Sequence, residues 1–141
     1  MDPTTTDTHR WHFIADIVVT ETVPGEITDD LYFRFVNEID IRNVWTVFSM
    51  AQSEAGSISA TQRKRVSAVM SKKGIAAVVI TDDTLTRGIV TAVSWLGVKA
   101  KAFTWKEIEK AIEFTTPKPE IQDQLRKIAF RFRAEIDKRK K

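Results

Sequence analysis

The chain has 141 residues, 43% of them hydrophobic, which suffices for one domain that buries about two-thirds of its unfolded surface. It has no cysteine, which excludes disulfides, thiolate metal sites and a catalytic thiol, and it has no apolar run close to the roughly 18 residues of a membrane span. Because residues 1–8 also lack the basic start and apolar stretch of a signal peptide, we expect a cytoplasmic protein without a membrane span.

The net charge of +3 is distributed unevenly along the chain. Residues 1–60 hold three Lys/Arg and ten Asp/Glu, whereas residues 61–141 hold nineteen and nine. This asymmetry can steer a charged partner, and the basic half makes nucleic acid a candidate. Solvated helix faces that differ in charge give the same pattern, so the charge distribution leaves the partner open.

The first third of the chain predicts a strand, a helix and a second strand. Residues 1–9 are polar and Thr-rich, which is typical of a disordered lead-in. Residues 11–22 form one β-rich run, expected to be a single bent or bulged strand that ends at a Pro-Gly turn. Thr28 is an N-cap candidate for a helix over 28–39, and the apolar run 44–50 predicts a central strand buried on both faces.

The middle of the chain continues this alternation. A helix is expected over 59–72, with Gly74 as its C-terminal cap, and the strand 75–81 that follows is the clearest buried strand in the sequence. Apolar residues at helical spacing over 85–96, and a strand-like run over 98–103, add a further helix and strand.

Two helices are expected at the end of the chain. Thr104 and Glu107 have the spacing of a capping box at the start of a short helix, which Pro117 ends. A long amphipathic helix follows over 120–139, with basic residues around one apolar stripe. The stripe consists of Ile121, Leu125, Ile128, Phe132 and Ile136.

This order of elements predicts an α/β fold with a mainly parallel sheet of four or five strands flanked by helices. We expect one domain over 10–116, followed by a basic amphipathic helix over 117–141. The apolar stripe of that helix must be covered either by its own domain or by a neighbouring copy, and the length of the helix favours a neighbouring copy. The sequence therefore predicts a homo-oligomer formed through this helix.

Five segments resemble a divergent bacterial group of STAS-like domains, named for sulfate transporters and anti-sigma factor antagonists. They are Ala60–Lys64 (ATQRK), Val78–Asp82 (VVITD), Thr86–Ala92 (TRGIVTA), Trp95–Val98 (WLGV) and Ala102–Phe103. The resemblance covers about residues 11–115. It implies a non-catalytic domain that binds a protein partner in a bacterial signalling or assembly system.

One part of the STAS pattern is altered in this chain. Antagonists of the family carry an Asp-Ser pair and a glycine where the second helix begins. If Ser59 takes the place of the phosphorylatable serine, the preceding acid is missing and Thr61 stands roughly where the glycine would be.

Two loops are the candidate partner-binding and modification sites, because loops at the carboxyl ends of parallel strands usually bind ligands or partners. Their alternative role is local, since Ser59 and either Asp83 or Thr84 can act as helix N-caps. The candidate residues are Ser57, Ser59, Thr61 and Arg63 in the first loop and helix start, and Asp82, Asp83, Thr84 and Arg87 in the second.

No catalytic, metal or cofactor residue is expected. Neither loop contains a Gly-rich phosphate cradle with its lysine. Asp82 and Asp83 are adjacent, so their side chains point apart, and no third carboxylate lies close by in the sequence. The only histidines, His9 and His12, fall in or beside the expected disordered lead-in, which disfavours a Ser-His-Asp arrangement.

Protein binding without catalysis is therefore the leading functional hypothesis. A nucleic-acid binder is the second, on account of Arg63-Lys64-Arg65 and Lys138–Lys141, although no recognisable reading motif accompanies these basic residues. A small enzyme of unknown class is the third, because a fold alone specifies no mechanism.

Overall fold

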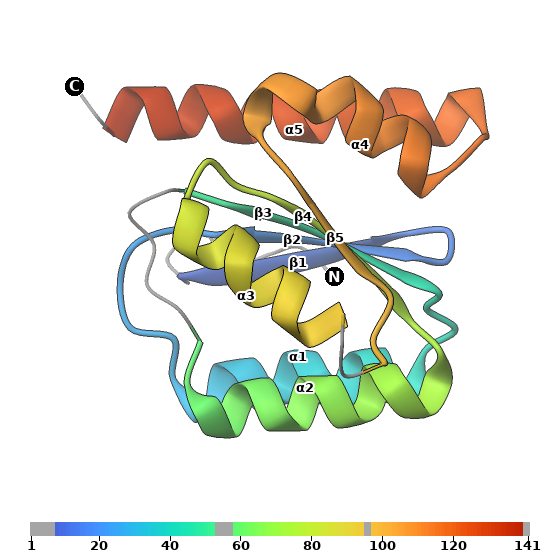
Figure 1. Ribbon diagram of the computed structural model, residues 1–141. Helices are drawn as coiled ribbons and strands as arrows, with labels where there is room; N and C mark the ends of the chain where they lie inside the picture. The colour runs from blue at the N-terminus through green and yellow to red at the C-terminus, as the bar shows by residue number, and fades with distance from the viewer. Residues whose placement is uncertain (1–7, 53–57, 95–96, 140–141) are drawn as a thin grey trace.

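The protein forms a five-stranded sheet between two layers of helices (Figure 1), as seen in a computed structural model that describes residues 8–52, 58–94 and 97–139. The strand order is β1-β2-β3-β4-β5, with β1 antiparallel to β2 and the remaining neighbours parallel. The predicted α/β class is confirmed, and the sheet is mixed. The strands are β1 (His9–Ile14), β2 (Ile17–Thr22), β3 (Thr46–Ala51), β4 (Ala76–Ile80) and β5 (Ala100–Phe103).

The prediction of a single strand over 11–22 is wrong, because this segment is a hairpin. The chain reverses at Ala15 and Asp16, and Ala15 has a φ of 52°, in the left-handed region that non-glycine residues seldom adopt. An Ala-Asp pair lacks the Asn-Gly or Asp-Gly signal of a tight hairpin, which explains why the turn was missed. The Asp16 carbonyl accepts a hydrogen bond from the Trp45 amide at 2.8 Å, which ties the turn to the start of β3.

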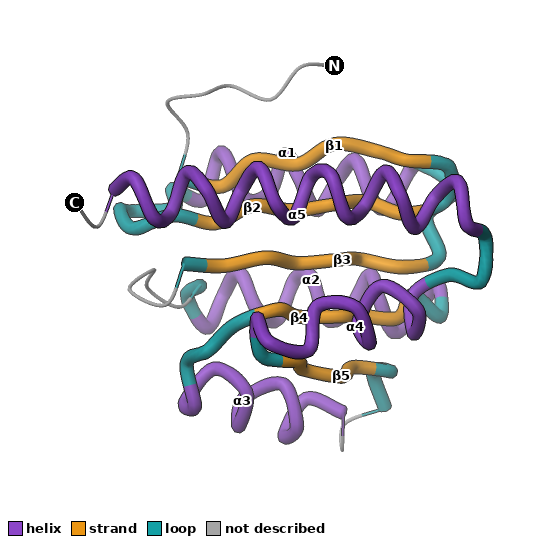
Figure 2. Tube along the Cα trace, turned by 90° about the horizontal axis from the view of Figure 1, so that it is seen from above, coloured by secondary structure: helices purple, strands orange, loops and turns teal. Residues whose placement is uncertain are grey.

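Helices α1 (Asp29–Ile41) and α2 (Ala60–Lys73) cover one face of the sheet, and α3 (Thr84–Ser94) lies beside β5 at its edge (Figures 1 and 2). The short 3-10 turn η1 (Trp105–Glu107), α4 (Ile108–Thr115) and α5 (Pro119–Arg139) follow, with α4 and α5 over the opposite face. The predicted caps are confirmed: Thr28 caps α1, Gly74 ends α2 with a φ of 69°, and Thr104 and Glu107 form their capping box.

The apolar stripe of α5 packs on the protein's own sheet, which corrects the expectation that it packs on a second copy. Leu125 and Phe132 are fully buried and share one core with Phe48 of β3 and Ile80 of β4. The whole stripe, Ile121, Leu125, Ile128, Phe132 and Ile136, belongs to or packs against this core. A 21-residue helix is long enough to lie across the sheet, so its length did not require an overhang.

The first strand also begins earlier than expected. His9, placed in the lead-in by the sequence, is the first residue of β1 and is only 5% exposed. It packs against the rings of Trp11, Tyr32 and Phe35, with centroid distances of 4.9 to 5.8 Å. These rings belong to the second core, which lies between the sheet and α1 and α2.

Candidate functional site

Ser59 is the N-cap of α2. Its hydroxyl oxygen accepts a hydrogen bond from the Gln62 amide at 3.1 Å, and the Gln62 side-chain oxygen accepts one from the Ser59 amide at 3.1 Å. This reciprocal pair satisfies two amides at the helix start. Thr61 lies in the first turn of α2 and is exposed, whereas Ser57 lies outside the described residues. The structure thus assigns Ser59 a capping role that the sequence had offered as the local alternative.

Asp82 and Asp83 each have a separate structural contact. Asp83 accepts hydrogen bonds from the amide and hydroxyl of Thr86, which caps α3 and lowers the pKa of the Asp83 carboxyl. Asp82 accepts a hydrogen bond from the Trp105 amide at 3.0 Å and lies 3.8 Å from Arg133. Arg87 donates to the hydroxyl of Thr84, the first residue of α3, at 3.2 Å.

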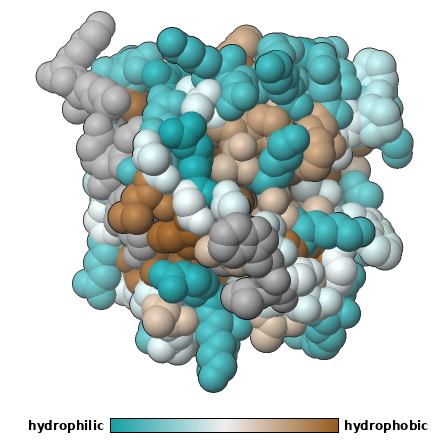
Figure 3. Space-filling view, viewed as in Figure 1, coloured by the Kyte–Doolittle hydropathy of each residue, from teal (hydrophilic) through white to brown (hydrophobic). Residues whose placement is uncertain are grey.

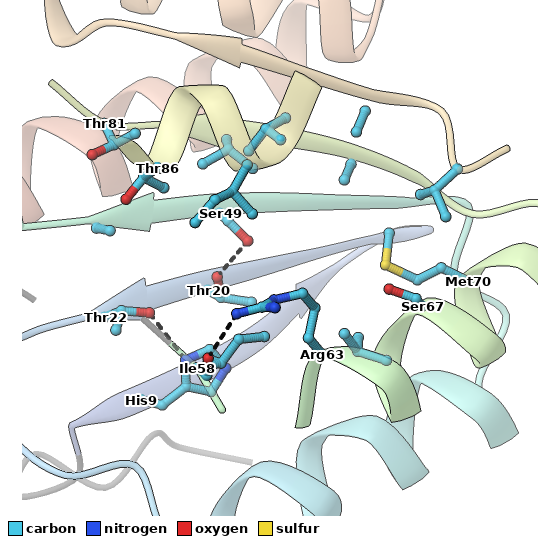
Figure 4. Close-up of a pocket in the computed structure, with 18 of the residues that line it drawn as sticks. His9, Thr20, Thr22, Ser49, Ile58, Arg63, Ser67, Met70, Thr81 and Thr86 are labelled. Carbon is cyan, nitrogen blue, oxygen red and sulfur yellow. Dashed lines mark hydrogen bonds between the residues drawn. The ribbon is translucent and has the colours of Figure 1, made fainter. Parts of the chain in front are cut away.

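A cavity of about 230 Å³ lies on the sheet face opposite α5, between the strands and helices α2 and α3 (Figure 4). Its walls combine apolar side chains with hydroxyl, amide, imidazole and guanidinium groups. The lining residues come from all five strands or their flanks and from α1, α2 and α3. The cavity reaches the carboxyl ends of β2, β3 and β4, where Thr22, Ala51 and Thr81 lie in or beside the wall.

Small side chains on the sheet create this cavity. On the face toward α5 the strands place large residues such as Phe48, Met50 and Ile80. On the opposite face several of the alternate positions hold side chains no larger than valine, and these positions lie in register across β2, β3 and β4. They are Thr20, Thr22, Ser49, Ala51, Ala77 and Val79, all of which line the cavity. Residues this small do not fill the space beneath α2 and α3.

Polar groups in the wall are paired on one side of the cavity (Figure 4). The Thr20 hydroxyl donates to the Ser49 hydroxyl at 2.9 Å, and the Thr22 hydroxyl lies 3.0 Å from Nδ1 of His9. Burial lowers the pKa of His9 to about 4, so its ring is neutral at neutral pH. Within the described residues, Nε2 of His9 and the side-chain oxygen of Gln52 are buried without a hydrogen-bond partner.

The two predicted loops meet at this cavity through only some of their residues. Arg63 of α2 lines it and donates to the Ile58 carbonyl at 3.3 Å, while Thr81 and Thr86 contribute from the second loop. β3 and β4 are parallel neighbours, as predicted, which is why both loops lie at one end of the sheet. Six candidate residues that the structure describes are not in the cavity wall: Ser59, Thr61, Asp82, Asp83, Thr84 and Arg87.

The residues that the sequence reasoning missed are those of the strands themselves. The runs 44–50 and 75–81 are interpreted from the sequence as apolar, β-branched strands, and Ser49 and Ala77 interrupt the large side chains within them. An alternation of large and small residues in several neighbouring strands was the available signal. Finding it required knowing which strands are neighbours and in which register.

No protein-family model, curated protein or solved structure matches this chain. Among the residues that the structure describes, no three His, Asp or Glu side chains lie together in a way that could hold a metal ion. No helix in that same part of the chain is both long and apolar enough to cross a membrane.

Proposed function

We propose that the protein is a non-catalytic protein-binding module of a bacterial signalling or assembly system in the cytoplasm, as the STAS-like resemblance implies. The observation that carries the proposal is the exposure of α3. None of the α3 side chains described is buried, although the helix contains Ile89 and Val90, and Leu85 is 71% exposed. A hydrophobic area lies at the surface over α3 (Figure 3), and such areas commonly mark interaction sites.

The charged residues within α2 and α3 support one partner chemistry. Five of the fourteen residues of α2 are Lys or Arg, α3 carries Arg87, and neither helix contains an acid. Lys73 is occupied at the C-terminus of α1, where it donates to three carbonyl oxygens. Lys64 lies near the start of α2, and Arg87 lies near the start of α3. We therefore propose a partner that presents an apolar side chain flanked by acidic residues.

The test is capture of partners from the native host by the immobilised full chain. Leu85→Asp places a charge in the apolar area and is expected to reduce recovery of the captured protein at least ten-fold. The stability of the Leu85→Asp variant should stay near that of the wild type, because Leu85 is largely exposed. Phe130→Asp is the matched control, since Phe130 is 58% exposed on α5. Equal capture by both variants would contradict the proposal.

Ser59 allows a separate test of regulation by charge. Ser59→Asp retains an N-cap acceptor and adds a negative charge, so partner recovery should change while the melting temperature stays close to the wild type. Ser59→Ala removes the side-chain cap without adding charge and should lower the free energy of unfolding by about 1 kcal/mol. If Ser59→Asp captures the partner normally, Ser59 is a helix cap and not a regulatory contact.

Two results would favour the other hypotheses. A salt-dependent shift of DNA or RNA that weakens on changing Arg63-Lys64-Arg65 would support a nucleic-acid binder. Hydrolysis of nucleotides or esters that disappears on changing Asp82 or Ser59 would support an enzyme.

A further inference from the structure

We infer that the cavity between the sheet and helices α2 and α3 binds a small, mainly apolar monocarboxylate. The site goes beyond the proposed partner binding and does not depend on it, because ligand binding can be measured on the protein alone. Three features of the cavity carry this inference: its size, its apolar walls and the one charged side chain among the lining residues described, Arg63.

The volume sets the size of the ligand. The cavity is partly open to the surface, and its volume of about 230 Å³ limits how large a ligand it can enclose. A cavity of roughly 150 Å³ lined by apolar residues holds benzene. The present cavity is about one and a half times as large, which corresponds to a ligand of about nine or ten non-hydrogen atoms.

The walls favour an apolar body. α2 contributes Val66 and Met70, α3 contributes Ile89 and Val90, and Val79 lies on the sheet. Contact with these side chains would remove the ligand's apolar surface from water, which is the main source of affinity in sites of this kind.

One end of the ligand should carry a negative charge. Among the lining residues that the structure describes, Arg63 alone has a permanent charge, because the depressed pKa of His9 leaves that ring neutral. Figure 4 shows the Arg63 side chain extending from α2, where it donates to the Ile58 carbonyl at 3.3 Å. Among the residues described, no carboxylate forms a salt bridge with Arg63. A ligand carboxylate would supply the anionic partner that an arginine in an apolar wall lacks.

Two further polar groups indicate a built binding site. Gln52 and His9 line the cavity and are only 6% and 5% exposed. The side-chain oxygen of Gln52 and Nε2 of His9 are buried and have no hydrogen-bond partner in the described part of the chain. An unsatisfied buried polar atom destabilises the folded protein. Such atoms beside a cavity can interact with a ligand or with water that the ligand orders.

The test uses three probes that share a phenyl ring and a two-carbon chain and differ in charge: phenylacetate, 2-phenylethanol and phenethylamine. We expect saturable binding of phenylacetate to the full chain by calorimetry or by amide chemical shifts. Phenethylamine should bind at least ten-fold more weakly. Arg63→Gln should weaken phenylacetate about ten- to a hundred-fold and leave 2-phenylethanol unchanged. Arg65→Gln is the matched control, because Arg65 lies on the same helix over the ring of Phe33 and outside the cavity wall.

A second variant tests the location. Ala77→Ile places a β-branched residue in the wall and should abolish binding of all three probes, while circular dichroism confirms the fold. Thr86→Leu fills the cavity from α3 and serves the same purpose if Ala77→Ile folds poorly. Normal binding by a folded cavity-filling variant, or no saturable binding of any probe to the wild type, would overturn the inference. If Arg63→Gln binds phenylacetate as Arg65→Gln does, the carboxylate assignment is wrong.

Discussion

The guanidinium of Arg10 on β1 donates a hydrogen bond at 3.0 Å to the carboxylate of Glu21 on β2, a side chain that is only 2% exposed. Glu21 is the only charged residue of β2, and burial raises the pKa of its carboxyl. Arg10 also pairs with Glu135 of α5 at 3.0 Å, and His12 lies 3.6 Å from Glu21. The hairpin is thereby joined to α5 by a partly buried charge network as well as by apolar contacts.

Arg10→Met should destabilise the protein by about 3 kcal/mol at pH 7, because it leaves the Glu21 carboxylate buried without its arginine partner. The pKa of Glu21 is raised in the folded state, so the protonated form is favoured there. The stability that this group contributes is present below its unfolded pKa and is lost as the pH rises through the folded value. The difference in unfolding free energy between Arg10→Met and the wild type, measured by urea unfolding, should therefore shrink as the pH falls toward 4.5.

The double variant Arg10→Met/Glu21→Gln is the control for this mechanism. It removes both charges and should regain a large part of the lost stability at pH 7. A double variant as unstable as Arg10→Met would indicate that Arg10 contributes mainly through its contact with Glu135.

His9 should make the protein sensitive to acid. Its pKa falls from 6.5 to about 4 on folding, so the stability that it contributes is complete above pH 6.5 and is lost as the pH falls through 4. The free energy of unfolding should fall by about 3 kcal/mol over this pH range. His9→Phe, which keeps an aromatic ring beside Phe35, should lose less stability than the wild type between pH 7 and pH 4. Parallel pH profiles for the two proteins would contradict this account.

Gly74 and Gly88 should respond in opposite ways to alanine. Gly74 ends α2 with a φ of 69°, where a Cβ is strained, so Gly74→Ala should destabilise the protein by about 1 kcal/mol. Gly88 lies inside α3 with open space around its Cα, so Gly88→Ala should stabilise the protein by about 0.5 to 1 kcal/mol. Thermal unfolding of the two variants tests both signs. A stabilising Gly74→Ala would refute the left-handed cap.

Phe132 and Phe130 test the packing of α5 on the sheet. Phe132→Ala removes a fully buried ring and should cost about 3 to 5 kcal/mol. Phe130→Ala changes a ring that is 58% exposed and should cost less than about 1 kcal/mol. A chain truncated after Pro117 should lose its cooperative unfolding transition, because truncation uncovers the face that α5 buries. A stable, soluble truncated protein would restore the expectation that the stripe packs between copies.

The sequence by itself determined the local elements that have strong physical signals. Gly74 supplied the left-handed cap, Thr104 and Glu107 the capping box, and the four-residue spacing of apolar residues the α5 helix. Each signal acts over a few residues, so it can be interpreted without knowing what lies across the fold. The hairpin has no such local signal, because Ala15-Asp16 lacks the glycine of a tight hairpin turn and the Trp45 amide bonds the Asp16 carbonyl from a distant part of the chain.

Only the tertiary structure decided what these elements contact. An amphipathic stripe specifies that it is buried but not by what, and the sheet's own Phe48 and Ile80 cover the stripe of α5. His9 appeared to lie in a polar lead-in, yet pairing with Thr22 places it in the aromatic core. The cavity depends on the register that aligns Thr20 with Ser49, because small residues leave a hollow only where they lie side by side. Contacts between residues distant in the chain depend on strand order and register, which periodicity within one strand does not encode.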